Sequence, residues 1–106
     1  MMREFDDLVF DGLSVPVTAK ALGKFKDGYP VGGRYYSDPP RIFVSSHAPL
    51  DEQVRNLQHE ALHHIFKVAG LWTRSPADEF VISRLTPWLV KFPKENPWFV
   101  EILQRG

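Results

Sequence analysis

A single long helix between residues 50 and 70 is the strongest constraint that this sequence places on its fold. Pro49-Leu50-Asp51 is a typical helix start, and Gly70 is a typical stop. Between them, apolar residues recur at about 100° per residue and form one stripe. The stripe consists of Val54, Leu57, Ala61, Ile65, Val68 and Ala69. Such a helix must bury one face, so the rest of the chain has to supply a surface that covers it.

The segment after this helix predicts two further helices. Ser75-Pro76-Ala77-Asp78 combines a cap residue, a proline at the first helical position and an acidic residue three positions after the cap. The second helix then has an apolar face made of Phe80, Val81, Leu85, Trp88, Leu89 and Phe92. Pro87 lies inside it and lacks an N–H, so we expect a kink or a split there. Asn96-Pro97 begins a short C-terminal helix that runs through Gln104.

The first half of the chain is rich in glycine, proline and β-forming residues and predicts a small sheet. Residues 13–20 alternate between apolar and polar, as a strand with one buried face does, and Pro16 places that strand at a sheet edge. Lys26-Asp27-Gly28 is a hairpin signal that leads into a second strand over about 31–36. A third strand follows over 41–46. We therefore expect an α+β fold, with a three-stranded antiparallel meander packed on the long helix.

Length and composition exclude several classes of protein. A chain of 106 residues is expected to form one domain, spanning 1–106. Lys plus Arg and Asp plus Glu are each 13, and this zero net charge argues against a nucleic-acid partner or an anionic membrane. The acidic segment 1–7 is unlike a signal peptide, and no apolar run reaches the ~20 residues of a membrane span, so we expect a cytoplasmic protein. Cysteine is absent, which leaves His, Asp and Glu as metal ligands.

The long helix contains an HExxH motif, His59-Glu60-Ala61-Leu62-His63. Histidines four positions apart point the same way, about one helical turn from each other, and can bind a single metal ion. Glu60 lies next to the first ligand, from where it can take a proton from a water on that ion as a general base. The alternative interpretation is a helix with two surface histidines and an incidental glutamate.

A catalytic metal site needs a third protein ligand and an open position for water. No histidine follows His64, which points about 100° around the helix from His63. The third ligand would then be a carboxylate or His47. Glu79, in the first turn of the second helix, approaches the first helix if the two helices pack antiparallel. The alternative role for Glu79 is a solvated carboxylate that stabilises a helix N-terminus.

Asp78 has a shorter reach than Glu79 and suits other roles. It can complete the helix cap with Ser75, or it can accept a hydrogen bond from the N–H of a ligand histidine.

Amide hydrolysis would also require a hydrogen-bond donor for the developing oxyanion. The sequence offers several candidates and does not choose among them: Tyr35, Tyr36, His47, His64 and Arg84. Cross-strand packing is the alternative role for the two tyrosines. His47 is also compatible with a loop position, and His64 with a surface position.

The motifs resemble those of a known family. HEALHHIF at 59–66, EFVISRL at 79–85 and NPWFV at 96–100 are similar to the small phage- and prophage-type zinc metallopeptidase-like proteins, which are related to the ImmA/IrrE metallopeptidase group. The resemblance covers residues 30 to 103. It implies a minimal zincin-like domain in which Glu79 completes a gluzincin-like ligand set with His59 and His63. It also implies one Zn²⁺ per chain and a peptide or protein substrate, although this ligand set also accepts other divalent ions.

Three functions are therefore open at this point. The first is a zinc metallopeptidase with Glu60 as general base. The second is a structural or protein-interaction module that a metal ion stabilises without catalysis, and the third is a protein-binding domain without a metal. Replacing Glu60 by glutamine separates the first two, because only a catalytic site needs that carboxylate.

Overall fold

The structure is a computed structural model that describes residues 5–105. Residues 1–4, which carry part of the acidic N-terminal segment, and residue 106 lie outside the described residues. As predicted, the described chain is α+β, with five short strands in two small sheets and three helices. The elements are β1 (Leu8–Phe10), β2 (Leu13–Val15), β3 (Val17–Lys20), β4 (Gly33–Ser37), β5 (Pro40–Ser45), α1 (Leu50–Val68), α2 (Pro76–Glu95) and α3 (Pro97–Arg105).

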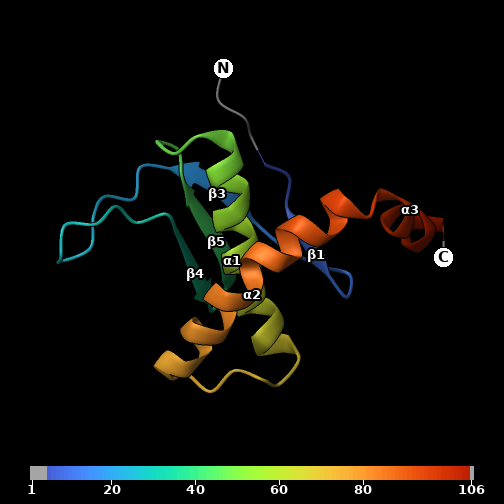
Figure 1. Cartoon of the computed structure of the whole chain (residues 1–106). Helices are drawn as coiled ribbons and strands as arrows, with labels where there is room; N and C mark the ends of the chain where they lie inside the picture. Colours follow the sequence, from blue (N-terminus) through green and yellow to red (C-terminus); the bar gives the residue numbers. More distant parts are fainter. Residues whose placement is uncertain (1–4, 106) are drawn as a thin grey trace.

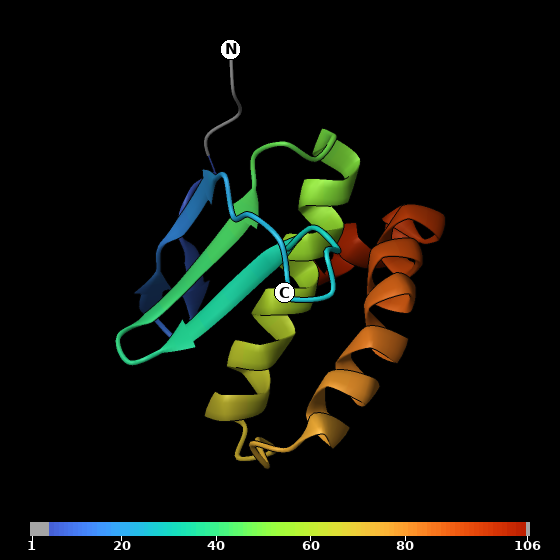
Figure 2. The ribbon, with the colours of Figure 1, turned by 90° about the vertical axis from the view of Figure 1, so that its left-hand side faces the viewer.

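The larger sheet, α1 and α2 form successive layers, which lie side by side in Figure 2. One side of α1 contacts β4 and β5, and another side contacts α2. The short helix α3 continues from the end of α2 and contacts that helix, well away from the sheet (Figure 1). The predicted long helix is therefore the central element of the fold, since both the sheet and the second helix pack on it.

The larger sheet is mixed, so the predicted antiparallel meander is wrong. Its strand order is β3-β5-β4, in which β4 and β5 form an antiparallel hairpin while β3 runs parallel to β5. The predicted turn at 26–28 exists, and Gly28 N–H donates to the carbonyl of Phe25 at 3.0 Å. It lies within the long connection between β3 and β4, which do not pair with each other.

The parallel pairing gathers the hydrophobic core. The buried cluster consists of Val15, Val17, Ile42, Val44 and Ala61. β5 carries three of the buried residues of the sheet and lies between two partner strands, so its backbone groups are paired on both sides. A meander would have placed the half-exposed β4 in that central position, which explains why the chain adopts the mixed order.

Pro16 divides the predicted strand 13–20 between two sheets. β2 pairs with β1 in a small antiparallel sheet, and β3 is an edge strand of the larger one. Pro16 has no N–H, but its carbonyl accepts a hydrogen bond from Ile42 N–H at 2.9 Å. β1 was not predicted. Its sequence signal is Asp11-Gly12, whose φ angles of 51° and 79° form a two-residue hairpin turn.

The predicted helix ends are confirmed. Gly70 ends α1 with a φ of 75°, a conformation that glycine adopts without strain. Ser75 caps α2, and its Oγ accepts a hydrogen bond from Ala77 N–H at 3.3 Å. α2 continues through both Pro87 and Pro93, so the predicted split is wrong. Both prolines lie on the exposed side, where water can bind the carbonyls that lose a partner.

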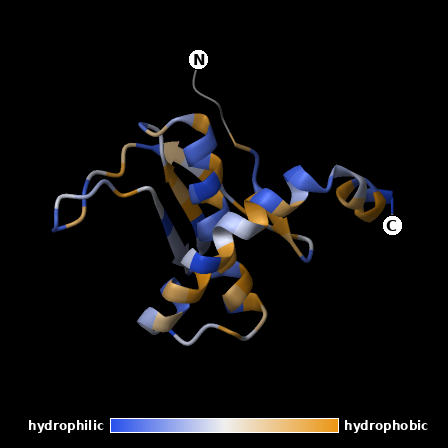
Figure 3. Cartoon of the chain, in the orientation of Figure 1, coloured by the Kyte–Doolittle hydropathy of each residue, from blue (hydrophilic) through white to orange (hydrophobic). Residues whose placement is uncertain are grey.

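The buried face of α2 differs from the predicted apolar face. Asp78, Ile82 and Thr86 are the buried residues of this helix and lie at four-residue spacing. Phe80 and Trp88, by contrast, are 62% and 68% exposed. The segment is a helix, as its periodicity predicts. The side that packs on α1, however, is the one that carries Asp78, Ile82 and Thr86. Figure 3 shows that α2 and α3 contain several apolar residues, and Trp88, Phe92, Trp98 and Leu103 among them are exposed.

Within residues 5–105, no helix has both the length and the apolar character that crossing a membrane requires.

Ile82 is completely buried, and it is the one apolar residue among the three buried residues of α2, the helix that packs on α1. We expect Ile82→Ala to lower the free energy of unfolding by about 2–5 kcal/mol, because the cavity it leaves cannot fully collapse. Urea denaturation followed by circular dichroism measures this loss. Val81→Ala, at a position that is 40% exposed, is the matched control and should cost under about 1 kcal/mol. Equal losses in the two variants would contradict this packing.

Candidate metal centre

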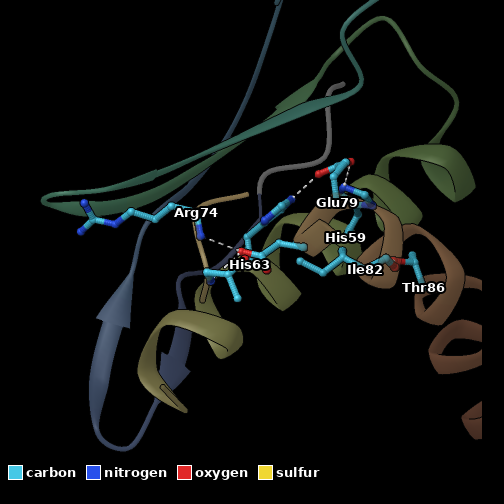
Figure 4. A network of polar contacts seen from close by, with 8 residues as sticks. His59, His63, Arg74, Glu79, Ile82 and Thr86 are labelled. Atoms are coloured by element: carbon cyan, nitrogen blue, oxygen red, sulfur yellow. Dashed lines mark hydrogen bonds and ion pairs between the residues drawn. The ribbon is translucent and has the colours of Figure 1, made fainter. Parts of the chain in front are cut away.

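His59, His63 and Glu79 come together between α1 and α2. His59 Nε2 lies 2.7 Å from Glu79 Oε1, and His63 Nε2 lies 2.8 Å from Glu79 Oε2. Figure 4 shows both imidazoles directed at the same carboxylate. The two histidines come from adjacent turns of α1, and their ring centroids are 5.2 Å apart. The helical spacing of the motif thus places two nitrogen donors on one side of α1, where the first turn of α2 supplies oxygen donors.

This donor set fits a divalent metal ion. One ligand atom from each of the three residues lies within 4.8 Å of the others. Around a tetrahedral ion with ligands at 2.0–2.1 Å, ligand atoms are roughly 3.3 Å apart. The observed contacts of 2.7 and 2.8 Å, one to each oxygen of Glu79, are shorter than this spacing, so the side chains would move apart to admit an ion. Two imidazoles and one carboxylate also leave a coordination position for water or substrate.

The loop before α2 fixes the start of that helix through Asp78. The Asp78 carboxylate accepts hydrogen bonds from Thr73 N–H at 3.0 Å, Thr73 Oγ1 at 2.7 Å and Arg74 N–H at 3.1 Å. The hydrogen bonds from Thr73 hold the pKa of Asp78 below its usual value. Because Asp78 precedes Glu79 directly, this cap also sets where the Glu79 side chain leaves the helix.

One of the two roles predicted for Asp78 is wrong. Within residues 5–105 its carboxylate binds the Thr73–Arg74 loop, and it accepts no hydrogen bond from His59 or His63. Its link to the cap residue Ser75 runs through Thr73, whose Oγ1 donates to Asp78, lies 2.7 Å from Ser75 Oγ and accepts from Ser75 N–H. The carboxylate thus holds the loop that immediately precedes α2.

Glu60 is buried beside the two histidines and lies against β4. Its residue exposure is 8%, and within residues 5–105 its carboxylate makes no hydrogen bond. A Cβ atom at Gly33 would lie 2.9 Å from Glu60 Oε2, so the strand can approach this closely only at a glycine. Burial and, secondarily, the charge of Glu79 raise the pKa of Glu60 to about 8, whereas the charge of Arg34 opposes the shift.

Two cavities adjoin this group. A cavity of about 380 Å³ is lined by His59, Glu60, His63 and Glu79 together with residues of β4. A cavity of about 420 Å³ lies on the other side, where Trp72, Arg74 and Asp78 line it. His63 and Glu79 line both cavities, so the three convergent side chains lie between two hollows that are open to solvent.

Tyr35 and His64 form a buried pair next to the histidine cluster. Tyr35 Oη lies 2.7 Å from His64 Nδ1, and the Tyr35 ring is nearly parallel to that of His63, with centroids 6.4 Å apart. His64 is 4% exposed, so the predicted surface position is wrong. Burial lowers the pKa of His64 and raises that of Tyr35. The tautomer of His64 decides which of the two atoms donates in this contact, so the role of the Tyr35 hydroxyl at the site stays a prediction.

The other residues predicted as oxyanion or substrate contacts lie partly at the site and partly away from it. Tyr36 lines the cavity that contains Glu60. His47 lies in another cavity, with Glu52 and Asn56, and does not reach the histidine pair. Arg84 stacks on Phe80, with its guanidinium carbon 4.9 Å from the ring centroid, and lines neither of the two cavities.

Several residues that line the two cavities were not identified from the sequence as site residues, among them Gly33, Arg34, Trp72 and Arg74. Gly33 and Arg34 precede the Tyr35-Tyr36 pair on the same short strand, and this proximity was the available signal. Trp72 and Arg74 lie in a loop whose course depends on the Asp78 cap, so the sequence carries no comparable signal for them.

Comparisons with family models, with curated proteins and with solved structures give no match to this chain. The resemblance to the phage-type metallopeptidase-like proteins therefore rests on the motifs of the sequence, and the ligand role of the three side chains stays a prediction.

The donor set predicts metal binding. We expect wild-type protein purified without added metal to carry about one divalent ion per chain, and elemental analysis would also identify that ion. Glu79→Ala should lose most of the ion, because two histidines alone bind it weakly. Glu95→Ala, near the other end of the same helix, is the control and should retain it. A protein that neither contains nor takes up a metal would contradict this prediction.

Proposed function

We propose that this chain is a zinc-dependent metallopeptidase, with one Zn²⁺ held by His59, His63 and Glu79 and with Glu60 as general base. One observation carries the proposal. Glu60 is only 8% exposed, and it lines the same cavity as the two histidines and Glu79. Burial raises the pKa of this carboxylate to about 8, and a carboxylate with a raised pKa that faces a metal-donor set has the properties of a general base.

The proposed chemistry divides between the ion and the chain. Bound zinc supplies a Lewis acid that lowers the pKa of a water molecule to about 7 and polarises the scissile carbonyl. Glu60 takes the proton from that water and delivers it to the leaving amine. Tyr36 lines the same cavity and is the candidate for stabilising the oxyanion. Glu79 and the histidines hold the site between two helices, so the reacting groups keep fixed positions.

The position of β4 supports a polypeptide as substrate. β4 is an edge strand of the larger sheet, and its residues line the cavity that contains Glu60. Such an edge offers unpaired backbone groups, to which an extended peptide can add as a further strand. A peptide held there would run past the histidine pair. The zero net charge of the chain makes a nucleic acid or an anionic membrane a poor alternative partner.

A metal-stabilised structural or interaction module is the second candidate, and the packing of α2 favours it. Of the 20 residues of α2, only Asp78, Ile82 and Thr86 are buried. An ion bound by His59, His63 and Glu79 would therefore add a substantial link between α1 and α2. In that case metal removal would lower the thermal unfolding midpoint, and no peptide would be cleaved.

Glu60→Gln distinguishes the two functions. Glutamine has nearly the same shape but cannot accept the water proton, so we expect peptide hydrolysis to fall at least about 100-fold while metal content is retained. Glu52→Gln is the matched control, because Glu52 is an exposed glutamate on the same helix. Wild-type protein that binds zinc but shows no Glu60-dependent hydrolysis would contradict the peptidase proposal and favour the structural module.

The contact between Gly33 and Glu60 provides a second test. A Cβ at Gly33 would lie 2.9 Å from both Cγ and Oε2 of Glu60 and 3.2 Å from the Phe43 carbonyl oxygen, so Gly33→Ala must displace the carboxylate. We expect hydrolysis to fall about 10- to 100-fold with unchanged metal content.

The neighbouring glycine supplies the control for this test. A Cβ at Gly32 would approach only the Asn56 side chain, at 2.8 Å, so Gly32→Ala should leave hydrolysis within about two-fold of wild type. Equal rates for the Gly33 and Gly32 variants would show that the position of Glu60 does not limit the reaction.

A further inference from the structure

Each of the two cavities beside the histidine cluster has an arginine stacked on an aromatic ring. In the larger cavity the guanidinium carbon of Arg74 lies 4.8 Å from the centroid of Trp72. In the smaller one the guanidinium carbon of Arg34 lies 5.6 Å from the centroid of Phe25. An arginine that stacks on a ring keeps its N–H groups free at the edge, where they can bind a carboxylate in a bidentate manner.

The acidic groups around the larger cavity do not neutralise Arg74. Asp78 binds Thr73 and the backbone N–H of Arg74 through its carboxylate. The oxygens of Glu79 are directed at the two histidines. A second cation lies close by, because Lys67 Nζ donates to the carbonyl oxygen of Ser37, which lines this cavity, at 2.6 Å. The Arg74 guanidinium itself forms no ion pair within residues 5–105, so its N–H groups are available to an anionic ligand group.

The backbone holds Arg74 in place. Its φ is 60°, in the left-handed region that side chains other than glycine and asparagine rarely adopt, and its N–H is bound to Asp78. Figure 4 shows the Arg74 side chain extending away from the pair formed by His63 and Glu79. A group bound by its guanidinium would thus lie at a distance from the reacting carbonyl. This is the position of a substrate side chain or chain end, not of the scissile bond itself.

The geometry points to a preference for acidic substrates. Building on the metallopeptidase proposed above, we propose that Arg74 and Arg34 bind carboxylates of the peptide on the two sides of the scissile bond. The carboxylates can belong to Asp or Glu side chains or, at one end, to the C-terminus of the peptide. Arg34 also lies near Glu60, whereas Arg74 does not influence that carboxylate, so Arg74 gives the cleaner test.

The test compares matched peptides with zinc-loaded protein. The peptides carry Glu or Gln at each position around the scissile bond, and each is made with a free and an amidated C-terminus. We expect the wild type to cleave the acidic peptides with a kcat/KM roughly three- to ten-fold higher, as exposed charge-assisted hydrogen bonds allow. The preference should weaken as salt rises from 0.05 to about 0.5 M, because exposed charges are screened.

The arginine variants assign the preference to residues. The measured quantity is the ratio of kcat/KM for the Glu peptide to kcat/KM for the matching Gln peptide. Arg74→Gln should bring this ratio to about one for positions on one side of the scissile bond, and Arg34→Gln should do so for positions on the other side. Arg84→Gln is the matched control, since Arg84 also stacks on an aromatic ring but lines neither cavity. It should keep the wild-type ratio. If amidation alone abolishes the preference, the bound carboxylate is the chain end; if it does not, the carboxylate is a side chain.

A binding measurement separates this inference from the proposed function. Zinc-loaded Glu60→Gln protein is titrated with the same peptides, and Trp fluorescence reports binding. If acidic peptides bind more tightly in an Arg74-dependent manner but wild type cleaves none, the selectivity stands and the peptidase proposal fails. Cleavage at equal rates for Glu and Gln peptides, or equal ratios in wild type and Arg74→Gln, would overturn the inference and leave the peptidase proposal intact.

Discussion

The close approach of β4 to α1 is the contact on which the site depends. Along the two elements the neighbouring pairs are Gly33 with Glu60, Tyr35 with His64 and Ser37 with Lys67. Alternate residues of the strand face the helix, while the helix presents residues three or four positions apart. Only a glycine opposite Glu60 leaves space for a buried carboxylate. The side of α1 that faces the sheet is thus polar at this point, and the adjacent side presents His59 and His63 to α2.

The sequence was informative wherever a feature is local. The histidine spacing, the Ser75 cap and the Gly70 stop each depend on neighbours within one helical turn, and all are present in the structure. The convergence of Glu79 on the histidines followed from one assumption, an antiparallel return of α2. The parallel pairing of β3 with β5 could not be predicted in the same way, because it joins segments more than twenty residues apart whose patterns suit either orientation.

Burial was the property least accessible from the sequence. Apolar residues at the helical period predict that a helix has an apolar side. They do not predict which other elements cover that side, because this depends on the tertiary structure. In α1, Val68 is 60% exposed while polar Glu60 and His64 are buried, because this helix packs on two elements at once. In α2, the cap at Asp78 and the contact of Glu79 fix the rotation of the helix, so Ile82 faces α1 and the larger apolar residues face outward. The constraints of the site therefore prevailed over the hydrophobic pattern.

The same geometry couples metal binding to the packing of α2. Three of the polar groups that join α1 to α2 are His59, His63 and Glu79, and without an ion the carboxylate already contacts both imidazoles. The ligands therefore need little rearrangement to bind a metal. Most of the conformational entropy that their ordering costs is already lost when α2 packs on α1. Conversely, an ion that binds only the packed arrangement stabilises it by mass action. In a small chain with few buried residues on α2, a catalytic ion would thus also act as a structural one, and loss of peptide cleavage alone would not separate the two roles.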